Sequence, residues 1–365
     1  MITFVPLEYY TPLYYNFLLV VLLIVLISPR SFTSAQNLKA KNILGLVLLL
    51  VSIFYIGLRP VSGKYFKDMS TYARTFLEYQ AGEDVRVEKD VQFEYFMKIC
   101  SSLMDVNIFF LLCAFIFIFP MYVLCKRVFK EYWFYAFFMF VASFSFWGAA
   151  VNGIRNGMAA SLFLLALAYA NKRVIMGLLF YVAVACHKSL LLPVAAYLVT
   201  YLYNDPKKYL LFWLFCIPLS FAAGGAFELL FTNLNIFEDE RIGYLSNEEG
   251  FEDNIANTGF RIDFIIYSAT GVLAGWFFLI KRKFEDVFYQ RIFNTFLLAN
   301  GFWILIIRAN FSNRFAYLSW FILGFLIIYP YLKLQFFRDQ NMAVKITMTM
   351  YFAFTYFMYI ILPLL

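Results

Sequence analysis

Six residues that can bind phosphate or transfer a proton stand at the ends of long apolar runs: Arg59, Arg155, His187, Lys188, Arg308 and Arg314. Arginine binds phosphate through two parallel hydrogen bonds, and helix N-termini attract anions. Several of these cations are expected close to helix N-termini, where the helix dipole opposes positive charge. Residues that break a local rule together often serve function. We therefore predict an anion-binding site, against the alternative that each cation only reaches the lipid interface.

His187 is the only histidine in the sequence. Together with Lys188 and Ser189 it separates two apolar runs. Histidine exchanges protons near neutral pH, so it is the candidate general base; the alternative is a structural role at a helix break. The adjacent Cys186 would point elsewhere on a helix, and we do not expect a nucleophilic cysteine. Six acidic residues are expected mainly to keep the outer loops soluble, although they could instead supply a general base or a cation site: Asp68, Glu78, Glu94, Glu238, Asp239 and Glu240.

The composition places these residues in a membrane protein. The 365 residues are 63% hydrophobic and only 15% charged, too few charges to cover a water-facing surface. The apolar runs are continuous, which favours helices over the alternating strands of a barrel. The net charge of +7 is spread in short clusters between these runs, so nucleic acid is not an expected partner. The sequence has no metal-ligand cluster and no glycine-rich nucleotide loop, and we expect no metal and no cofactor.

We predict an all-α polytopic protein, with residues 1–365 forming a single integral membrane domain without internal repeats. The first apolar run lacks a basic start and a cleavage site, so we expect it to be retained. About twelve membrane spans are predicted, at 9–28, 42–58, 107–125, 132–148, 156–170, 174–186, 189–203, 209–223, 264–280, 292–307, 315–332 and 346–364. The short runs 174–186 and 189–203 could instead be one broken or re-entrant element.

Charge asymmetry predicts the orientation. One set of connecting segments holds 17 Lys and Arg against 5 Asp and Glu, and the opposite set holds 13 against 18. The basic set is expected in the cytoplasm. Residues 59–106 and 224–262 then form two longer extracytoplasmic loops, and the first contains two amphipathic stretches that we expect to form helices lying over the site. The candidate cations fall on this outer side.

Four short motifs resemble the EpsG-type branch of the Wzy-like bacterial exopolysaccharide and O-antigen polymerases. They are Gly57-Leu58-Arg59, Ile154-Arg155-Asn156-Gly157-Met158-Ala159, His187-Lys188-Ser189 and Asn313-Arg314-Phe315-Ala316-Tyr317, in the family's order. A tyrosine-rich helix containing Tyr72 follows the first motif. One departure is that Ser62-Gly63-Lys64-Tyr65 stands where the family often has Gly-Thr-Asp-Tyr, so an acidic role at that point is in doubt.

The resemblance implies a GT-C-like glycosyltransferase in the bacterial inner membrane, working on the periplasmic or exterior face. The donor would be an oligosaccharide on polyprenyl pyrophosphate, and the acceptor a sugar hydroxyl of a second lipid-linked unit. His187 would be catalytic and the five cations would bind pyrophosphate, with supporting roles for Tyr72, Asn156, Ser189, Asn313 and Tyr317. The partners implied are both lipid-linked glycans, membrane lipid and a chain-length regulator.

Other functions stay open from the sequence. A membrane O-acyltransferase that modifies polysaccharide would also have many spans and a working histidine, but its acyl donor arrives from the cytoplasm. A transporter or flippase for lipid-linked sugars would show related halves and ionisable groups deep in the spans. A ligase that transfers finished glycan shares the chemistry of a polymerase.

Overall fold

The computed structural model describes residues 4–28, 34–85, 91–233, 260–308 and 313–364. Within these ranges the regular structure is helical and contains no strand, which confirms the all-α prediction. The helices pack as two compact units, one formed by Met1–His187 with Tyr331–Leu365 and the other by Lys188–Pro330. Each unit is described separately.

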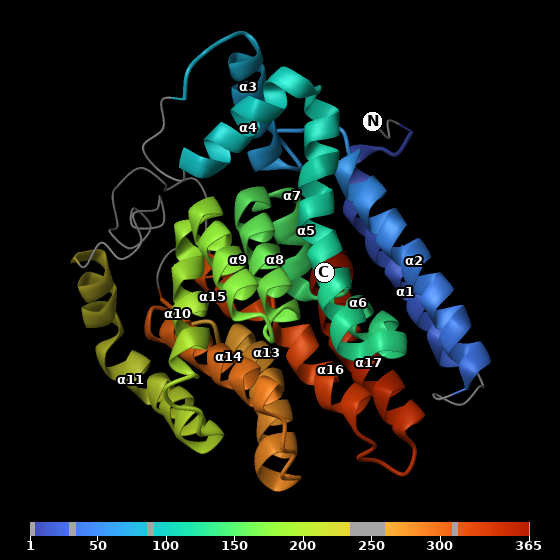
Figure 1. The fold of residues 1–365 in the computed structure, drawn as a ribbon, viewed down its shortest axis with the longest axis vertical. Coiled ribbons are helices and arrows are strands. Elements are labelled where there is room, and N and C mark those ends of the chain that lie inside the picture. The colour runs from blue at the N-terminus through green and yellow to red at the C-terminus, as the bar shows by residue number, and fades with distance from the viewer. Residues whose placement is uncertain (1–3, 29–33, 86–90, 234–259, 309–312, 365) are drawn as a thin grey trace. The chain divides into compact units, whose positions relative to one another are not determined.

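The first unit holds long helices and one layer of shorter ones (Figure 1). Its helices are α1 (Tyr10–Ile27), α2 (Ala35–Gly57), α3 (Lys67–Gln80), α4 (Val91–Leu103), α5 (Val106–Phe129), α6 (Trp133–Val141), α7 (Phe144–Val151), α8 (Ile154–Ala168), α9 (Arg173–Cys186) and α17 (Gln340–Tyr356). Helix α5 packs on α2 and α8, and α8 packs on α9. Helices α3 and α4 lie together across one end of α5 and α9, so the two predicted amphipathic helices are confirmed.

The second unit is built around α14 (Val287–Leu305). Its other helices are α10 (Leu191–Val199), α11 (Pro206–Asn233), α13 (Ile262–Gly275) with a π-helical turn at Trp276–Lys281, and α15 (Asn313–Trp320). Helix α16 (Leu323–Lys333) crosses the division between the units. Helices α10, α11, α13 and α15 all contact α14, which is therefore the central helix of this unit.

Among the described residues, six helical segments are long and apolar enough to cross a membrane. They are Leu7–Ile27, Ala35–Gly57, Val106–Val141, Ile262–Lys281, Arg314–Lys333 and Gln340–Leu364. The twelve predicted apolar segments all contain helix, but the predicted count of twelve spans is not confirmed. Helices such as α7 and α8 have 8 and 15 residues and rise about 12 and 22 Å, less than the ~30 Å of a bilayer core.

Three boundaries differ from the sequence prediction. The expected span 132–148 is broken between α6 and α7, where Ser143 adopts an extended conformation that hydropathy cannot reveal. Helix α11 continues to Asn233 past a non-helical residue, Ala223, so the first part of the expected loop 224–262 is helical. Most of that loop, with the acidic residues from Glu238 to Glu240, lies outside the described residues. Helix α2 begins at Ala35 and includes its basic first turns.

A close approach of α7 to α8 explains one glycine of the Arg155 motif. A Cβ atom on Gly157 would lie 2.7 Å from the backbone oxygen of Ala149 and 3.2 Å from a ring carbon of Phe117. Any larger residue would force the two helices apart. Gly177 in α9 is different, because a Cβ atom there would meet no atom within 4 Å.

This contrast gives a stability prediction. Gly157→Ala should destabilise the protein by about 1–3 kcal/mol, the usual effect of overpacking a tight contact. Gly177→Ala is the matched control, and it should be neutral or slightly stabilising because alanine is the better helix former. Thermal unfolding of the detergent-solubilised protein measures both, and equal midpoints for the two variants would contradict the close α7–α8 contact.

Candidate functional site

The two ends of the first unit differ in charge. At one end, Lys345 of α17 donates to the carbonyls of Leu26 and Ser28 at 3.0 and 2.8 Å, and Lys41 of α2 donates to the carbonyl of Ile24 at 3.5 Å. The basic first turns of α2 and α17 therefore meet the end of α1. At the same end, Arg127 donates to the carbonyl of Ala168 at 2.8 Å. These are segments that the sequence assigns to the basic side.

The candidate residues of this unit lie at the opposite ends of the same helices. Arg59 follows the C-terminus of α2, Arg155 lies in the first turn of α8, and His187 follows the C-terminus of α9. The opposite ends of α2, α8 and α9 adjoin connecting segments of the basic set defined from the sequence. The fold therefore brings Arg59, Arg155 and His187 to one end of the first unit, next to the layer formed by α3 and α4.

Arg59 is 2% exposed and is held by the backbone. Its Nη1 and Nη2 atoms donate to the carbonyls of Ile56 and Val151, at 2.5 and 3.3 Å. The guanidinium carbon lies 5.4 Å from the ring centre of Phe66 and 5.9 Å from that of Phe110. Such rings favour a cation when water is excluded. Arg59 thus joins the end of α2 to the end of α7.

The charge of Arg59 has no acidic partner among the described residues. Burial lowers the pKa of Arg59 to about 10, which still leaves the guanidinium charged at neutral pH. Its Nε atom is buried and makes no hydrogen bond within the described part of the chain. A buried, charged donor without an acceptor is costly, so an anionic or polar ligand would be stabilised here.

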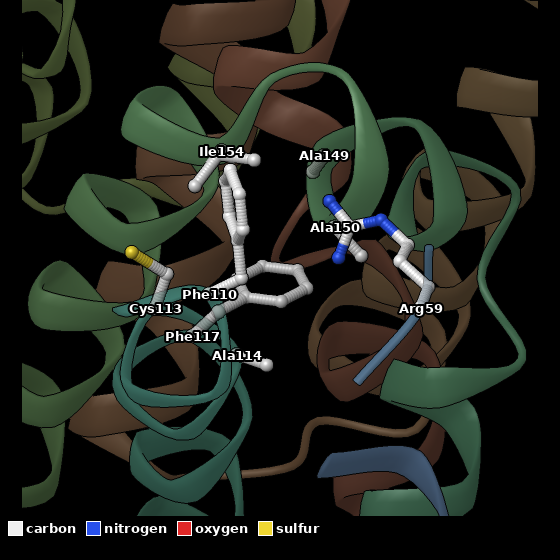
Figure 2. A pocket seen from close by; sticks show the side chains of 8 residues that line it. All are labelled: Arg59, Phe110, Cys113, Ala114, Phe117, Ala149, Ala150 and Ile154. Atoms are coloured by element: carbon white, nitrogen blue, oxygen red, sulfur yellow. The ribbon is translucent and has the colours of Figure 1, made fainter. Parts of the chain in front are cut away.

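A small pocket faces this group (Figure 2). It is lined by Arg59, Phe110, Cys113, Ala114, Phe117, Ala149, Ala150 and Ile154. Figure 2 shows the Arg59 guanidinium beside Ala149 and Ala150, with the rings of Phe110 and Phe117 across the pocket. The free space holds roughly one water molecule, so a pyrophosphate group does not fit as the helices stand. Arg59 can present one donor there and stabilise the neighbouring α7–α8 turn.

Arg155 is less buried than Arg59 and faces the α3–α4 layer. Its guanidinium carbon lies 6.0 Å from the ring centre of Phe93 in α4, and the Phe93 ring lies 5.5 Å from that of Tyr72 in α3. Burial raises the pKa of Tyr72, and the charge of Arg155 opposes that rise, so the two groups are electrostatic neighbours. Tyr72 and Arg155 were predicted from distant parts of the sequence, and the fold brings them together.

Glu94 is a feature of this layer that sequence reasoning underestimated. It is 6% exposed, and its Oε2 atom accepts a hydrogen bond of 2.8 Å from the hydroxyl of Tyr79. The carboxylates of Glu94 and Asp68 both raise the pKa of Tyr72. Glu78, by contrast, lies on an exposed face and pairs with Arg74 at 3.7 Å. The available sequence signal was the helical spacing of α4, which places Glu94 beside the buried Phe93 and Met97 side of the helix.

His187 occupies the predicted helix break. It ends α9 in an extended conformation and is 4% exposed. The preceding Cys186 contacts the backbone oxygen of Arg155 through its sulfur at 3.9 Å, so the break lies beside the start of α8. Beyond the break, Lys188 is exposed and Ser189 is buried in a short 3-10 turn.

The second unit carries the remaining candidates. Arg308 is exposed after the end of α14, and Arg314 is half-buried in the first turn of α15. The side chain of Asn313 lies outside the described residues. Tyr317 is half-buried, with its ring 5.7 Å from that of Trp320. The structure thus divides the predicted site residues into two groups, one in each unit.

Taken together, these features define a multi-pass helical membrane protein with the buried Arg59 and the half-buried Arg155 at one end of its first unit. Residues 42–363 match the EpsG family, so this chain belongs to the EpsG family, a family of Wzy-like polymerases. Membership supports a general role in polysaccharide polymerisation. No curated protein and no solved structure is significantly similar to this chain.

Proposed function

We propose that this protein is a polysaccharide polymerase of the bacterial inner membrane. It transfers a glycan from polyprenyl pyrophosphate to a sugar hydroxyl of another lipid-linked repeat unit on the extracytoplasmic face. The observation that carries the proposal is the gathering of Arg59, Arg155 and His187 at one end of the first unit, away from its basic end. Family membership supports a role in polysaccharide polymerisation in general.

In this proposal Arg155 is the main pyrophosphate ligand of the first unit. It is only half-buried, so its guanidinium can reach a lipid-linked substrate, whereas Arg59 is fixed to two backbone carbonyls. Arg155 would neutralise the charge that develops as the pyrophosphate departs with the electron pair of the broken C–O bond. Arg59 adds positive charge at the same end of the unit. Lys188, Arg308 and Arg314 of the second unit are also proposed as ligands of phosphate oxygens.

His187 is proposed to accept the proton of the acceptor hydroxyl while the oxygen of that hydroxyl attacks the anomeric carbon of the donor. The reaction uses no cofactor, and cationic side chains take the place of a metal. Supporting contacts to the glycans are assigned to five residues: Tyr72, Asn156, Ser189, Asn313 and Tyr317. A GT-C-like architecture, and a chain-length regulator as protein partner, complete the proposal.

The proposed orientation in the membrane rests on the same difference in charge between the two ends of the first unit. The basic end is placed in the cytoplasm, and the candidate site is placed outside. Cysteines introduced in residues 59–85 should react in intact cells with a thiol reagent that cannot cross the inner membrane, after permeabilising any outer membrane. Cysteines near Lys283, in the basic segment 281–291, should react only after the cells are broken. Labelling of Lys283→Cys but not of Tyr65→Cys in intact cells would place the site in the cytoplasm, and the outer-face proposal would be wrong.

The polysaccharide of cells that lack the gene tests the function. We expect a single repeat unit attached to polyprenyl pyrophosphate to accumulate at the outer face, and long glycan to disappear. Full-length glycan lacking acyl groups would indicate an O-acyltransferase instead. Single units retained at the inner face would indicate a flippase, and polymerised glycan that stays on its lipid would indicate a ligase.

A further inference from the structure

Asn300 in α14 is a buried hydrogen-bonding centre of the second unit. It is 0% exposed. Its Nδ2 atom donates to the hydroxyls of Ser268 in α13 and Ser319 in α15, both at 3.0 Å. Its Oδ1 atom accepts a bond of 2.8 Å from the indole nitrogen of Trp213 in α11. One side chain therefore links α14 to three other helices.

Trp320 strengthens the link to α15. Its indole nitrogen donates to the same Ser268 hydroxyl at 2.8 Å. Its ring lies 5.0, 5.1 and 5.7 Å from the ring centres of Phe264, Tyr267 and Trp303. Two consecutive residues of α15, Ser319 and Trp320, are thus anchored to the rest of the unit by both polar and aromatic contacts.

These bonds restrict rotation of α15 about its axis. In an apolar interior each broken bond leaves a polar group without a partner, which is unfavourable, and connected bonds strengthen one another. Successive residues of a helix differ by about 100°. Ser319 therefore projects roughly 140° away from Arg314, so the network holds the side of α15 opposite that arginine. A turn of α15 would break the bonds to Ser319 and Trp320 and redirect Arg314.

We propose that Asn300 is a positioning residue, which fixes the rotation of α15 and thereby the direction of the Arg314 side chain. The inference rests on the proposed function, because that function gives Arg314 its role as a phosphate ligand. Asn300 itself bonds to three side chains, those of Trp213, Ser268 and Ser319, and acts on the substrate only through α15.

The chain offers a matched control six positions earlier in the same helix. Asn294 is also 0% exposed, and its Nδ2 atom donates to Oδ1 of Asn204 at 2.8 Å. This bond leads toward the start of α11 and does not involve α15. Asn294→Leu and Asn300→Leu therefore remove comparable buried amides from one helix, but only Asn300→Leu releases α15.

The first test measures the placement of residue 314 without any activity. Arg314→Cys is introduced after the five native cysteines are replaced, and its reaction rate with a cationic thiosulfonate reagent is followed. Asn300→Leu should change this rate severalfold, and Asn294→Leu should leave it within about twofold. Equal labelling rates of Arg314→Cys in the presence of Asn300 and of Asn300→Leu would overturn the positioning role of Asn300. If Asn300→Leu does not fold, Ser319→Ala removes one of its bonds and should shift the rate in the same direction.

The second test asks whether Asn300 acts through Arg314. Asn300→Leu should lower kcat on the order of tenfold, since small displacements of a binding group have effects of that size or larger, with little change in KM. In an Arg314→Lys background the same change should lower kcat less than about twofold, because the effects are coupled. Equal losses in both backgrounds would overturn the inference. Normal activity of both Arg314→Lys and Arg314→Ala would instead reject the proposed phosphate-binding role of Arg314. The labelling rates would still show whether Asn300 positions residue 314.

Discussion

Replacing Arg155 by alanine should abolish polymer while the protein remains in the membrane. Arg155 is half-buried at the start of α8, beside the ring of Phe93 and within electrostatic reach of Tyr72. Removing one group that stabilises developing negative charge typically lowers turnover about a hundredfold to a thousandfold. Turnover of the purified variants with a defined lipid-linked repeat unit measures the loss.

A positive charge at position 155 should not by itself restore turnover. Arg155→Lys keeps the positive charge but loses the planar pair of donors, so we expect it to recover less than about a tenth of wild-type turnover. Arg74→Ala is the control, because Arg74 lies on the same side of the unit but is exposed, and its ion pair within the described residues is with Glu78 on an exposed face. Near-normal turnover in both Arg155 variants would reject the pyrophosphate role of this residue.

His187→Gln should reduce turnover by about a hundredfold to ten-thousandfold, the usual contribution of a general base. Glutamine retains hydrogen bonding and much of the shape, so the buried helix break should persist. An ordinary histidine titrates near pH 6.5 and is an effective base only when neutral. The wild-type rate should therefore fall at acidic pH, where a histidine base is protonated, and the variant should lose this acidic limb of its pH–rate profile.

A variant that keeps more than a tenth of wild-type turnover with an unchanged pH profile would show that His187 is structural. The structure then points to Glu94 as the next base to test. It is buried, and its carboxylate is held by Tyr79, whereas Glu78 is engaged on an exposed face. Glu94→Gln preserves the side-chain shape and removes the proton acceptor. Tyr79→Phe separates a positioning role from catalysis, because it removes only the hydrogen bond to Glu94.

The helices were largely predictable because apolar runs and amphipathic spacing are local signals. The breaks inside those runs were not. The break between α6 and α7 at Ser143 lies within a stretch whose hydropathy stays high. Ala223 leaves the helical conformation directly before Gly224 and Gly225, a glycine pair that hydropathy does not register. The count of twelve spans is not confirmed for a related reason, because hydropathy measures the apolar length of a segment and not where its helix stops.

The site residues that stand at helix ends could be found from the sequence, since Arg59, Arg155 and His187 interrupt apolar runs. Residues whose roles depend on packing could not. The bond between Tyr79 and Glu94 joins two separate helices. The contacts of Asn300 come from three helices, and nothing in its own neighbourhood of the sequence distinguishes it from Asn294. Such partners are set by tertiary contacts, which one sequence does not encode as a local pattern.

The most direct test of the central claim uses the purified protein in lipid vesicles with a defined glycan on polyprenyl pyrophosphate as the only substrate. We expect a ladder of lipid-linked products that differ by one repeat unit, with one polyprenyl pyrophosphate released for every unit added. Arg155→Ala should form neither product. Unextended substrate in the presence of the folded wild-type protein, or chain growth without release of polyprenyl pyrophosphate, would contradict it.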